Sequence, residues 1–229
     1  MRFYAMPSKD GHANAHTPSL RNVFDRASQS AARVRAGAQQ AIYAPGDGDD
    51  AIYLIESGQV KLSMSSAAGK DCLMAIYTVG EIFGESCFVG SGRRIETAAA
   101  MQPTVVQRVS RRDFLAEVQK SSATESLLGH LAKRIVERQT AVFDLVTMDA
   151  EHRLAKVLLE FAEKLGTTDG PYLRLGQRIS HEELSQIVGT TRPRVSAFMQ
   201  NFRRLGILED AKSRAISLHR AKAQEFLRD

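Results

Sequence analysis

Short runs of alternating apolar and polar residues fill the chain between positions 33 and 109. Their apolar members are Val60, Leu62 and Met64 in one run and Leu73, Ala75, Tyr77 and Val79 in the next. A period of two is typical of half-buried strands, and turn residues such as Pro45-Gly46 and Ser57-Gly58 separate the runs. Several short strands joined by tight turns predict a sandwich or a barrel closed on itself.

At Ser110 the apolar period becomes helical. Ser110 with Asp113 is a helix-start signature, because the hydroxyl can accept from an unpaired backbone N–H and the carboxylate suits the positive helix end. Ser122 with Glu125 predicts a second helix start for the same reason. The second helix then carries a heptad seam whose members are Leu128, Leu131, Ile135, Arg138, Val142 and Leu145.

A seam of two residues in seven is narrower than the apolar stripe of most globular helices. It predicts pairing with a second copy of the chain through Leu128, Leu131, Ile135, Val142 and Leu145. The alternative is a helix that simply lies on the barrel. Arg138 is the charged member, and burial of a charge at a dimer seam is costly unless the charge is paired. It could hold an anionic ligand, pair across the dimer or extend to solvent.

Breaks in these patterns divide the chain. Asp149 is a candidate N-cap for a new amphipathic helix that ends at Gly166, and residues 166–171 predict a polar loop before a short strand at 172–175. We therefore predict a flexible N-terminal segment at 1–18, a strand-rich domain at 19–120, the seam helix at 121–147 and a further module at 148–229.

The last module contains a predicted helix-turn-helix. Ser180 with Glu183 forms a capping box, and Gly189 follows the first helix where a sharp turn needs a positive φ. The second helix opens at Thr191 and tolerates Pro193 in its first turn, where no N–H partner is lost. Apolar residues lie at −5, −1, +6 and +9 from the glycine, with a small residue at −4. This spacing favours two helices packed across a tight turn.

The outward face of the second helix carries polar side chains: Arg192, Arg194, Ser196 and Gln200. An arginine near the start of such a helix can donate two bonds to guanine, although two exposed arginines are also common on solvated helix faces. Beyond the helix, two short apolar runs flank residues 210–214 and predict a β-hairpin wing.

The net charge of +5 sits at one end of the chain. Residues 1–173 hold 20 Lys and Arg against 20 Asp and Glu, whereas residues 174–229 hold 11 against 6. Such segregation favours a small basic module that meets a polyanion, attached to a neutral module with another task.

Other features narrow the function classes. No run of 18 uncharged apolar residues and no secretory signal occurs, so we expect a soluble cytoplasmic protein without a membrane partner. Two cysteines, Cys72 and Cys87, exclude a disulfide framework, a four-thiolate zinc site and a cysteine-only iron–sulfur cluster, and we expect no metal. No motif of a nucleotide-hydrolysing, metal-dependent or serine-type enzyme appears, so we do not expect catalysis.

The order of these parts and their motifs resembles the CRP/FNR superfamily of bacterial transcription regulators, over about residues 33–218. The similar segments are Tyr43-Ala-Pro-Gly-Asp47, Tyr53-Leu-Ile-Glu-Ser-Gly-Gln-Val-Lys-Leu62, Gly80-Glu-Ile-Phe-Gly-Glu85 and Leu184-Ser-Gln-Ile-Val-Gly-Thr-Thr-Arg-Pro-Arg-Val195. The resemblance implies an α+β fold: an N-terminal β-roll of the cyclic-nucleotide-binding (jelly-roll) type as sensor domain, a long dimerisation helix and a C-terminal winged helix-turn-helix.

That resemblance also implies the partners. They are a second copy of the chain, double-stranded DNA with a two-fold symmetric operator, and RNA polymerase, which the 166–171 segment would touch by analogy. The base-contacting residues implied are Arg192, Arg194, Ser196 and Gln200. The implied backbone contacts come from Ser180, His181, Thr191 and Lys212. Cyclic-AMP-type members place Arg-Glu at the start of the recognition helix, so Pro193 predicts a different operator.

For an effector, the resemblance implies a site in the β-roll and on the long helix. Its residues would be Gly84, Glu85, Ser86, Arg94, Thr97, Arg138 and Gln139. Cyclic-AMP-binding members hold the phosphate with an adjacent Arg-Ser pair, where ungapped counting places Ile95-Glu96 here, and the Glu96 carboxylate would repel a phosphate. Arg94 takes the arginine's place only if one residue is skipped.

The sequence therefore leaves open what would activate the regulator that this resemblance implies. Cyclic AMP, another nucleotide such as a cyclic dinucleotide, oxidation of Cys72 or Cys87, and a constitutively competent dimer all fit the sequence. The cysteine cluster and axial histidines of members that use an iron–sulfur cluster or haem are missing, so neither cofactor is expected. A second hypothesis is a cyclic-nucleotide-binding regulatory subunit that acts on a partner protein.

Overall fold

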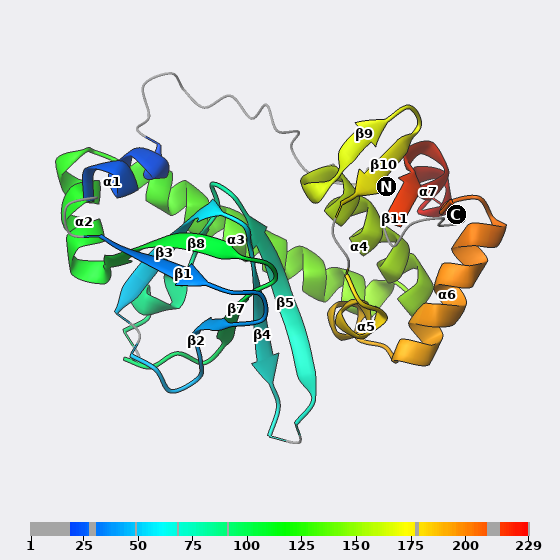
Figure 1. Ribbon diagram of the computed structural model, residues 1–229, viewed down its shortest axis with the longest axis horizontal. Coiled ribbons are helices and arrows are strands. Elements are labelled where there is room, and N and C mark those ends of the chain that lie inside the picture. The colour runs from blue at the N-terminus through cyan, green and yellow to red at the C-terminus, as the bar shows by residue number, and fades with distance from the viewer. Residues whose placement is uncertain are drawn as a thin grey trace.

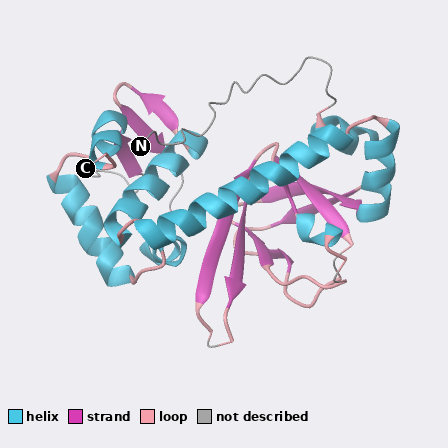
Figure 2. Ribbon diagram, turned by 180° about the vertical axis from the view of Figure 1, so that it is seen from behind, coloured by secondary structure: helices cyan, strands magenta, loops and turns pink. Residues whose placement is uncertain are grey.

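The computed structural model describes residues 19–27, 31–48, 50–67, 69–90, 92–176, 179–209 and 216–228. Within them, a β-roll and a C-terminal module are joined by one long helix, α3 (Thr124–Thr147), which runs the length of the β-roll (Figures 1 and 2). The segment predicted at 1–18 and the tip of the predicted wing lie outside the described residues. None of the described helices is long and apolar enough to cross a membrane.

Two four-stranded antiparallel sheets form the β-roll. Their strands are β1 Ala32–Ala36, β2 Ala41–Tyr43, β3 Ala51–Ser57, β4 Gln59–Ser65, β5 Asp71–Thr78, β6 Ile82–Phe83, β7 Thr97–Ala100 and β8 Thr104–Ser110. The strand orders are β1-β8-β3-β6 and β2-β7-β4-β5. Between the sheets lies a core that is rich in aromatic rings, including Tyr43, Tyr53 and Phe83. The predicted closed strand-rich domain is confirmed.

Strand β5 departs from the predicted alternation because of a β-bulge. Its register against β4 shifts between Leu62 and Ser63, so β5 carries one extra residue there. Leu73 therefore packs into the core of the C-terminal module, whereas Tyr77 packs inside the β-roll. Val79 lies in the turn after the strand and is exposed, so the prediction that these residues share one face was wrong.

Short helices cover one end of the β-roll: α1 (Leu20–Arg26), the 3-10 helix η2 (Glu85–Phe88) and α2 (Arg111–Lys120). Ser110 caps α2 as predicted, because its hydroxyl accepts from the backbone N–H of Asp113 at 3.1 Å. Phe24 of α1 and Phe114 of α2 are fully buried, with ring centroids 5.3 Å apart. These helices build a second core against the outer face of β3 and β8.

Helix α3 begins at Thr124 and not at the predicted cap, Ser122. Ser122 has a positive φ of 55°, and Ala123 stands at the N-cap position without a side-chain hydrogen bond. The backbone N–H of Ser122 donates to the carbonyl of Gln119, and that of Ala123 to the carbonyl of Val118. Ser122 therefore terminates α2 in a left-handed conformation, a role that its hydroxyl does not reveal.

In the part of the chain that the structure describes, the C-terminal module consists of four helices and a three-stranded sheet. The elements are α4 Ala150–Leu165, β9 Thr167–Asp169, β10 Tyr172–Leu175, α5 His181–Val188, α6 Arg192–Arg204, β11 Ile216–His219 and α7 Arg220–Phe226. The Asp149 carboxylate caps α4 as predicted, accepting from the N–H groups of Glu151 and His152. The strand at 172–175 is confirmed, but residues 167–169 form its hairpin partner where a loop was predicted.

Only the base of the predicted wing is described. Leu208 forms a β-bridge with Leu218, and the backbone N–H of Glu209 donates to the carbonyl of Ser217 at 3.0 Å. The two sides of the wing, at Leu208 and Leu218, are therefore neighbours in the sheet. Lys212 lies outside the described residues.

The two modules share packing and ion pairs. Ile76 of β5 belongs to the hydrophobic core of the C-terminal module, and α5 packs against β5. Lys61 of β4 lies 2.8 Å from the carboxylate of Glu183 on α5, and both side chains are largely buried. Lys164 of α4 reaches back to the carboxylate of Glu81 at 2.8 Å. The position of the helix-turn-helix is therefore set partly by the β-roll.

Candidate nucleic-acid interface and effector site

The helix-turn-helix has the predicted local geometry. The Ser180 hydroxyl accepts from the backbone N–H of Glu183, whose carboxylate accepts from the N–H of Ser180, so both halves of the capping box are present. Gly189 ends α5 with φ 71°, the left-handed conformation that the turn requires. Thr191 stands at the N-cap of α6 without a side-chain hydrogen bond, and Pro193 lies in the first turn.

Glu183 does more than cap its helix. Burial alone would raise the pKa of its carboxyl group, but hydrogen bonds from Lys61 and from Ser180 outweigh burial and hold that pKa below its ordinary value. The carboxylate therefore stays ionised and links the cap of α5 to strand β4 of the β-roll.

Helix α6 presents its polar face to solvent. Val195, Met199 and Phe202 are buried in the module, while Arg192 and Arg194 are exposed at the start of the helix. Gln200, one of the predicted base contacts, is exposed two turns further along. Phe198, the apolar residue at +9 from Gly189, is half-buried, and the Arg194 guanidinium lies 5.5 Å from the centre of its ring. That contact restricts a long cationic side chain.

Ser196 and His181, predicted as base and backbone contacts, bind each other. The distance between Ser196 Oγ and His181 Nδ1 is 2.9 Å, and the Ser196 hydroxyl donates to the carbonyl of Arg192 at 3.1 Å. Burial, together with the charges of Arg203 and Arg192, lowers the pKa of His181 below its ordinary value. This pair joins the start of α5 to the recognition helix.

The predicted effector residues surround the aromatic interior of the β-roll. Gly84 has φ 89° and would place a Cβ within 3.2 Å of the carbonyl oxygen of Ala51, so the turn after β6 requires glycine. Arg94 is 2% exposed and lies 4.2 Å from the centre of the Tyr43 ring. Its guanidinium donates to the carbonyl of Gly84 at 3.0 Å and to the hydroxyl of Ser86 at 2.9 Å, and it also donates to the Ala51 carbonyl.

Glu96 also binds members of this group of residues. Its carboxylate accepts from the Tyr43 hydroxyl at 3.1 Å and from the Ser86 hydroxyl at 3.2 Å. Burial, and then the charge of Glu96, raise the pKa of Tyr43, so its hydroxyl keeps the proton that it donates. Thr97, another predicted member, begins β7 and pairs with Ser63 in the sheet. A carboxylate therefore lies close to the buried Arg94, since both side chains bind the Ser86 hydroxyl.

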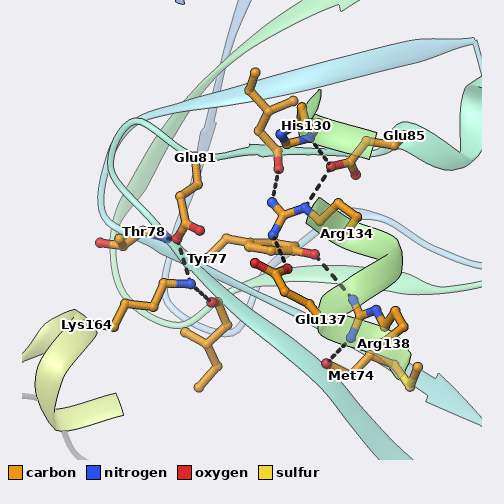
Figure 3. A network of polar contacts seen from close by, with 12 residues as sticks. Met74, Tyr77, Thr78, Glu81, Glu85, His130, Arg134, Glu137, Arg138 and Lys164 are labelled. Carbon is orange, nitrogen blue, oxygen red and sulfur yellow. Dashed lines mark hydrogen bonds and ion pairs between the residues drawn. The ribbon is translucent and has the colours of Figure 1, made fainter. Parts of the chain in front are cut away.

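Three basic residues of α3 bind the β-roll: His130, Arg134 and Arg138 (Figure 3). His130 Nε2 lies 2.7 Å from the carboxylate of Glu85, and Arg134 Nε lies 3.2 Å from the same oxygen. Burial alone would raise the pKa of Glu85, but these two partners outweigh burial and hold that pKa below its ordinary value. Glu85, one of the predicted effector residues, thus binds the long helix.

Arg134 and Arg138 also contact strands β5 and β6. Arg134 donates to the carbonyl of Ile82 at 2.8 Å and lies 4.3 Å from the centre of the Tyr77 ring. Arg138 donates to the Met74 carbonyl at 2.5 Å, so its charge is directed toward its own β-roll. Gln139 is exposed.

Comparison with known proteins agrees with this architecture. The family model of the cyclic nucleotide-binding domain matches residues 33–121, and that of the Crp-like helix-turn-helix domain matches residues 152–223. A CRP-like cAMP-activated global transcriptional regulator of Mycobacterium tuberculosis (strain H37Rv) is 33% identical over 180 residues, 77% of this chain and 80% of that protein. The chain belongs to the CRP/FNR family of transcription regulators.

Further relatives are consistent with this assignment. The cyclic AMP receptor protein of Thermus thermophilus is 30% identical, with 73% of this chain and 74% of that protein covered. A solved structure of a CooA mutant from Carboxydothermus hydrogenoformans has a TM-score of 0.74 at 24% identity, covers 92% of this chain and 96% of its own, and shows the shared fold. The protein is a DNA-binding transcription regulator of the CRP/FNR type, and the alternative of a regulatory subunit is not favoured.

In this CRP/FNR regulator most of the predicted dimer seam is exposed on the single chain. Leu128 is 63% exposed and Val142 is 61% exposed, and Ile135 and Leu145 are similarly open to solvent. Leu131 differs, because it packs partly against the β-roll core. Arg138, predicted within the same seam, faces β5. Further exposed apolar side chains that the seam omitted are Val136, Phe143 and Val146.

Two residues of this CRP/FNR regulator that bind Glu85, His130 and Arg134, were not predicted from the sequence. Their signal was present, because basic residues at positions 130, 134 and 138 recur every four residues and so share one helix face. Cys72 is exposed on β5 and Cys87 is buried in η2. Within the described residues, no group of three or more His, Cys, Asp or Glu is placed to hold a metal ion.

Proposed function

We propose that this regulator binds a two-fold symmetric operator as a homodimer and reads it with α6. The observation that carries the proposal is the exposed face of α6, where Arg192 and Arg194 stand at the start of the helix and Gln200 follows. Arginine at this end of a recognition helix can contact guanine O6 and N7 in the major groove. Ser196 is the fourth proposed base contact, and it lies beside His181.

Backbone contacts hold the helix in its groove. Ser180, His181 and Thr191 lie at the starts of α5 and α6, where backbone N–H groups and helix dipoles favour phosphate. Lys212 is the fourth proposed phosphate contact. The exposed apolar face of α3 supplies the dimer interface, which sets two recognition helices at a fixed spacing.

The β-roll is the sensor in this proposal, and residues 19–120, 121–147 and 148–229 are sensor, dimerisation helix and DNA-binding module. Gly84, Glu85, Ser86, Arg94, Thr97, Arg138 and Gln139 are its proposed effector residues. The cAMP-activated relatives suggest a cyclic nucleotide. Arg94 and Glu85 suit its phosphate and ribose hydroxyl, but Glu96 opposes the phosphate. RNA polymerase is the proposed further partner. The proposed location of the protein is the cytoplasm.

Selection from a random pool of DNA duplexes, with the protein alone and with cyclic AMP added, tests this function. An inverted repeat enriched in either arm supports a DNA-reading dimer. Enrichment only with cyclic AMP identifies the nucleotide as the trigger in spite of Glu96. Enrichment in both arms means that cyclic AMP does not gate binding, and no specific sequence in either arm would contradict the proposed reading head.

A further inference from the structure

His181 is one of the proposed phosphate contacts, and its ring binds a residue of a second helix. It is the first residue of α5, it is half-buried, and its Nδ1 lies 2.9 Å from Ser196 Oγ on α6. The Ser196 hydroxyl in turn lies 3.1 Å from the carbonyl of Arg192. Two short contacts therefore meet at one hydroxyl group.

The geometry at this hydroxyl favours one tautomer of the imidazole. A serine hydroxyl has one proton to donate, and Ser196 donates it to the carbonyl of Arg192. Its oxygen can then only accept from His181, so the ring proton sits on Nδ1. A neutral imidazole has one N–H, which leaves Nε2 as an acceptor. Phosphate oxygens also accept, so a bond from Nε2 to phosphate needs a second proton on the ring.

We infer that His181 takes up a proton when DNA binds, so that the regulator holds the phosphodiester backbone more weakly as pH rises. The inference rests on the proposed DNA-binding function and adds a regulatory property to it. Because the contact is made to phosphate, it is independent of base sequence.

The charges around His181 favour a neutral ring before DNA arrives. From α6, Arg192 and Arg203 act on it, and with burial they lower its pKa. On α5, Glu182 and Glu183 follow it, and Glu183 is paired with Lys61 of β4. Strand β5 packs against α5 with Leu73 and Ile76. From α4, Arg153 donates to the carbonyl of Val188 at the far end of α5.

A phosphate group reverses this balance. It places negative charge beside the ring and accepts the hydrogen bond that only the protonated form can donate, so the pKa of His181 rises on binding. Between the lower value in the unbound protein and the higher value in the complex, binding consumes protons. In that window the affinity falls as pH rises, by at most about tenfold per pH unit for each His181 engaged.

Fluorescence anisotropy with the full-length protein tests the inference. The probes are a labelled duplex of arbitrary sequence and a duplex carrying a selected operator, titrated between pH 5.5 and 8.5 at constant ionic strength. We expect Kd to rise several-fold with pH on both duplexes. A flat profile on both would overturn the inference and leave the proposed function intact, whereas no binding at any pH would overturn both.

Three variants identify the group responsible. His181→Gln should flatten the profile, because the amide donates at every pH. Ser196→Ala frees Nδ1, so that a neutral ring can carry its proton on Nε2. On the duplex of arbitrary sequence, where no base contact of Ser196 is lost, the profile should become shallower, with tighter binding than wild type above pH 8. His152→Gln, a matched half-buried histidine near the start of α4, should keep the wild-type profile.

These variants also define the contrary results. If Ser196→Ala remained as steep as the wild type, the ring proton would not be fixed by Ser196 and the inference would fail. If His152→Gln abolished the dependence, the proton would bind elsewhere. Thermal unfolding of each variant confirms that the fold is intact.

Discussion

Arginine side chains serve different purposes in this regulator according to what surrounds them. Arg192 is exposed at the start of α6, where its guanidinium can approach a base edge. Arg94 is buried in the β-roll and donates to backbone carbonyls, and Arg134 joins α3 to Glu85. A guanidinium has five donors in a fixed fork, so one residue type can clamp backbone in one place and read guanine in another.

Replacing Arg192 by Ala should weaken operator binding by about 1–3 kcal/mol and relax the preference at one base pair. Lys212→Ala should instead weaken binding to all sequences alike and reduce the salt dependence, because it removes a phosphate contact. Titrations with the operator and with a scrambled duplex over a range of salt concentrations separate the two effects. Equal losses by both variants on both duplexes would refute these roles.

Replacing Glu85 by Gln should destabilise the β-roll at pH 7 by about 1.5–3 kcal/mol, since it removes charged hydrogen bonds with His130 and Arg134. Because the folded state lowers the pKa of Glu85, its contribution is present above the unfolded pKa of about 4.3 and is lost as pH falls through the folded value. Urea unfolding at pH 7 and pH 3 measures both effects.

Glu225→Gln provides the control for that experiment. Glu225 is exposed in the last turn of α7, so its replacement should change stability by less than about 0.5 kcal/mol at either pH. A Glu85→Gln protein as stable as the control at pH 7 would mean that the contacts to α3 contribute nothing.

At the scale of elements, α3 has two different faces. Its basic stripe at positions 130, 134 and 138 binds the β-roll, while Ile135, Val142 and neighbouring apolar residues remain exposed. Exposed apolar patches of this kind mark interaction sites. One helix can therefore contact Glu85 and the β-roll on one side and a second subunit on the other.

Ile135→Glu should disrupt the dimer, because it places a charge within the apolar face that two helices would bury. Sedimentation velocity at micromolar concentration should show a monomer for this variant and a dimer for the wild type. Lys133→Glu is the matched control, since residues two apart on a helix face different directions. A dimeric Ile135→Glu protein would place the interface elsewhere.

At the scale of the whole molecule, the β-roll and the DNA-binding module contact each other directly. Lys61–Glu183 and Lys164–Glu81 cross the boundary beside a shared apolar core. Figure 3 shows that the second pair lies next to Tyr77, on whose ring Arg134 also packs. The recognition face of α6 stays exposed in this arrangement.

Lys61→Glu should loosen this boundary, because it sets two carboxylates against each other in a largely buried position. We expect a larger radius of gyration in small-angle scattering and faster proteolysis near residue 148. Lys70→Glu, in the exposed turn between β4 and β5, should leave both unchanged. Unaltered scattering and proteolysis for Lys61→Glu would show that apolar packing alone holds the modules together.

Local patterns in the sequence determined the parts of this protein and their order. Capping residues, a required glycine and apolar periods are properties of neighbouring residues, so α2, α4 and the helix-turn-helix followed from them. The resemblance to the CRP/FNR superfamily added the β-roll and its predicted site residues.

Only the tertiary structure decided which charges meet. The bulge in β5, the termination of α2 at Ser122 and the pairing of His181 with Ser196 depend on residues brought together by packing. The resemblance placed Glu85 among the effector residues, but in the fold its carboxylate binds His130 and Arg134, 45 and 49 positions away. Hydrogen bonds and ion pairs act over a few ångströms, and sequence order does not reveal which distant side chains come that close.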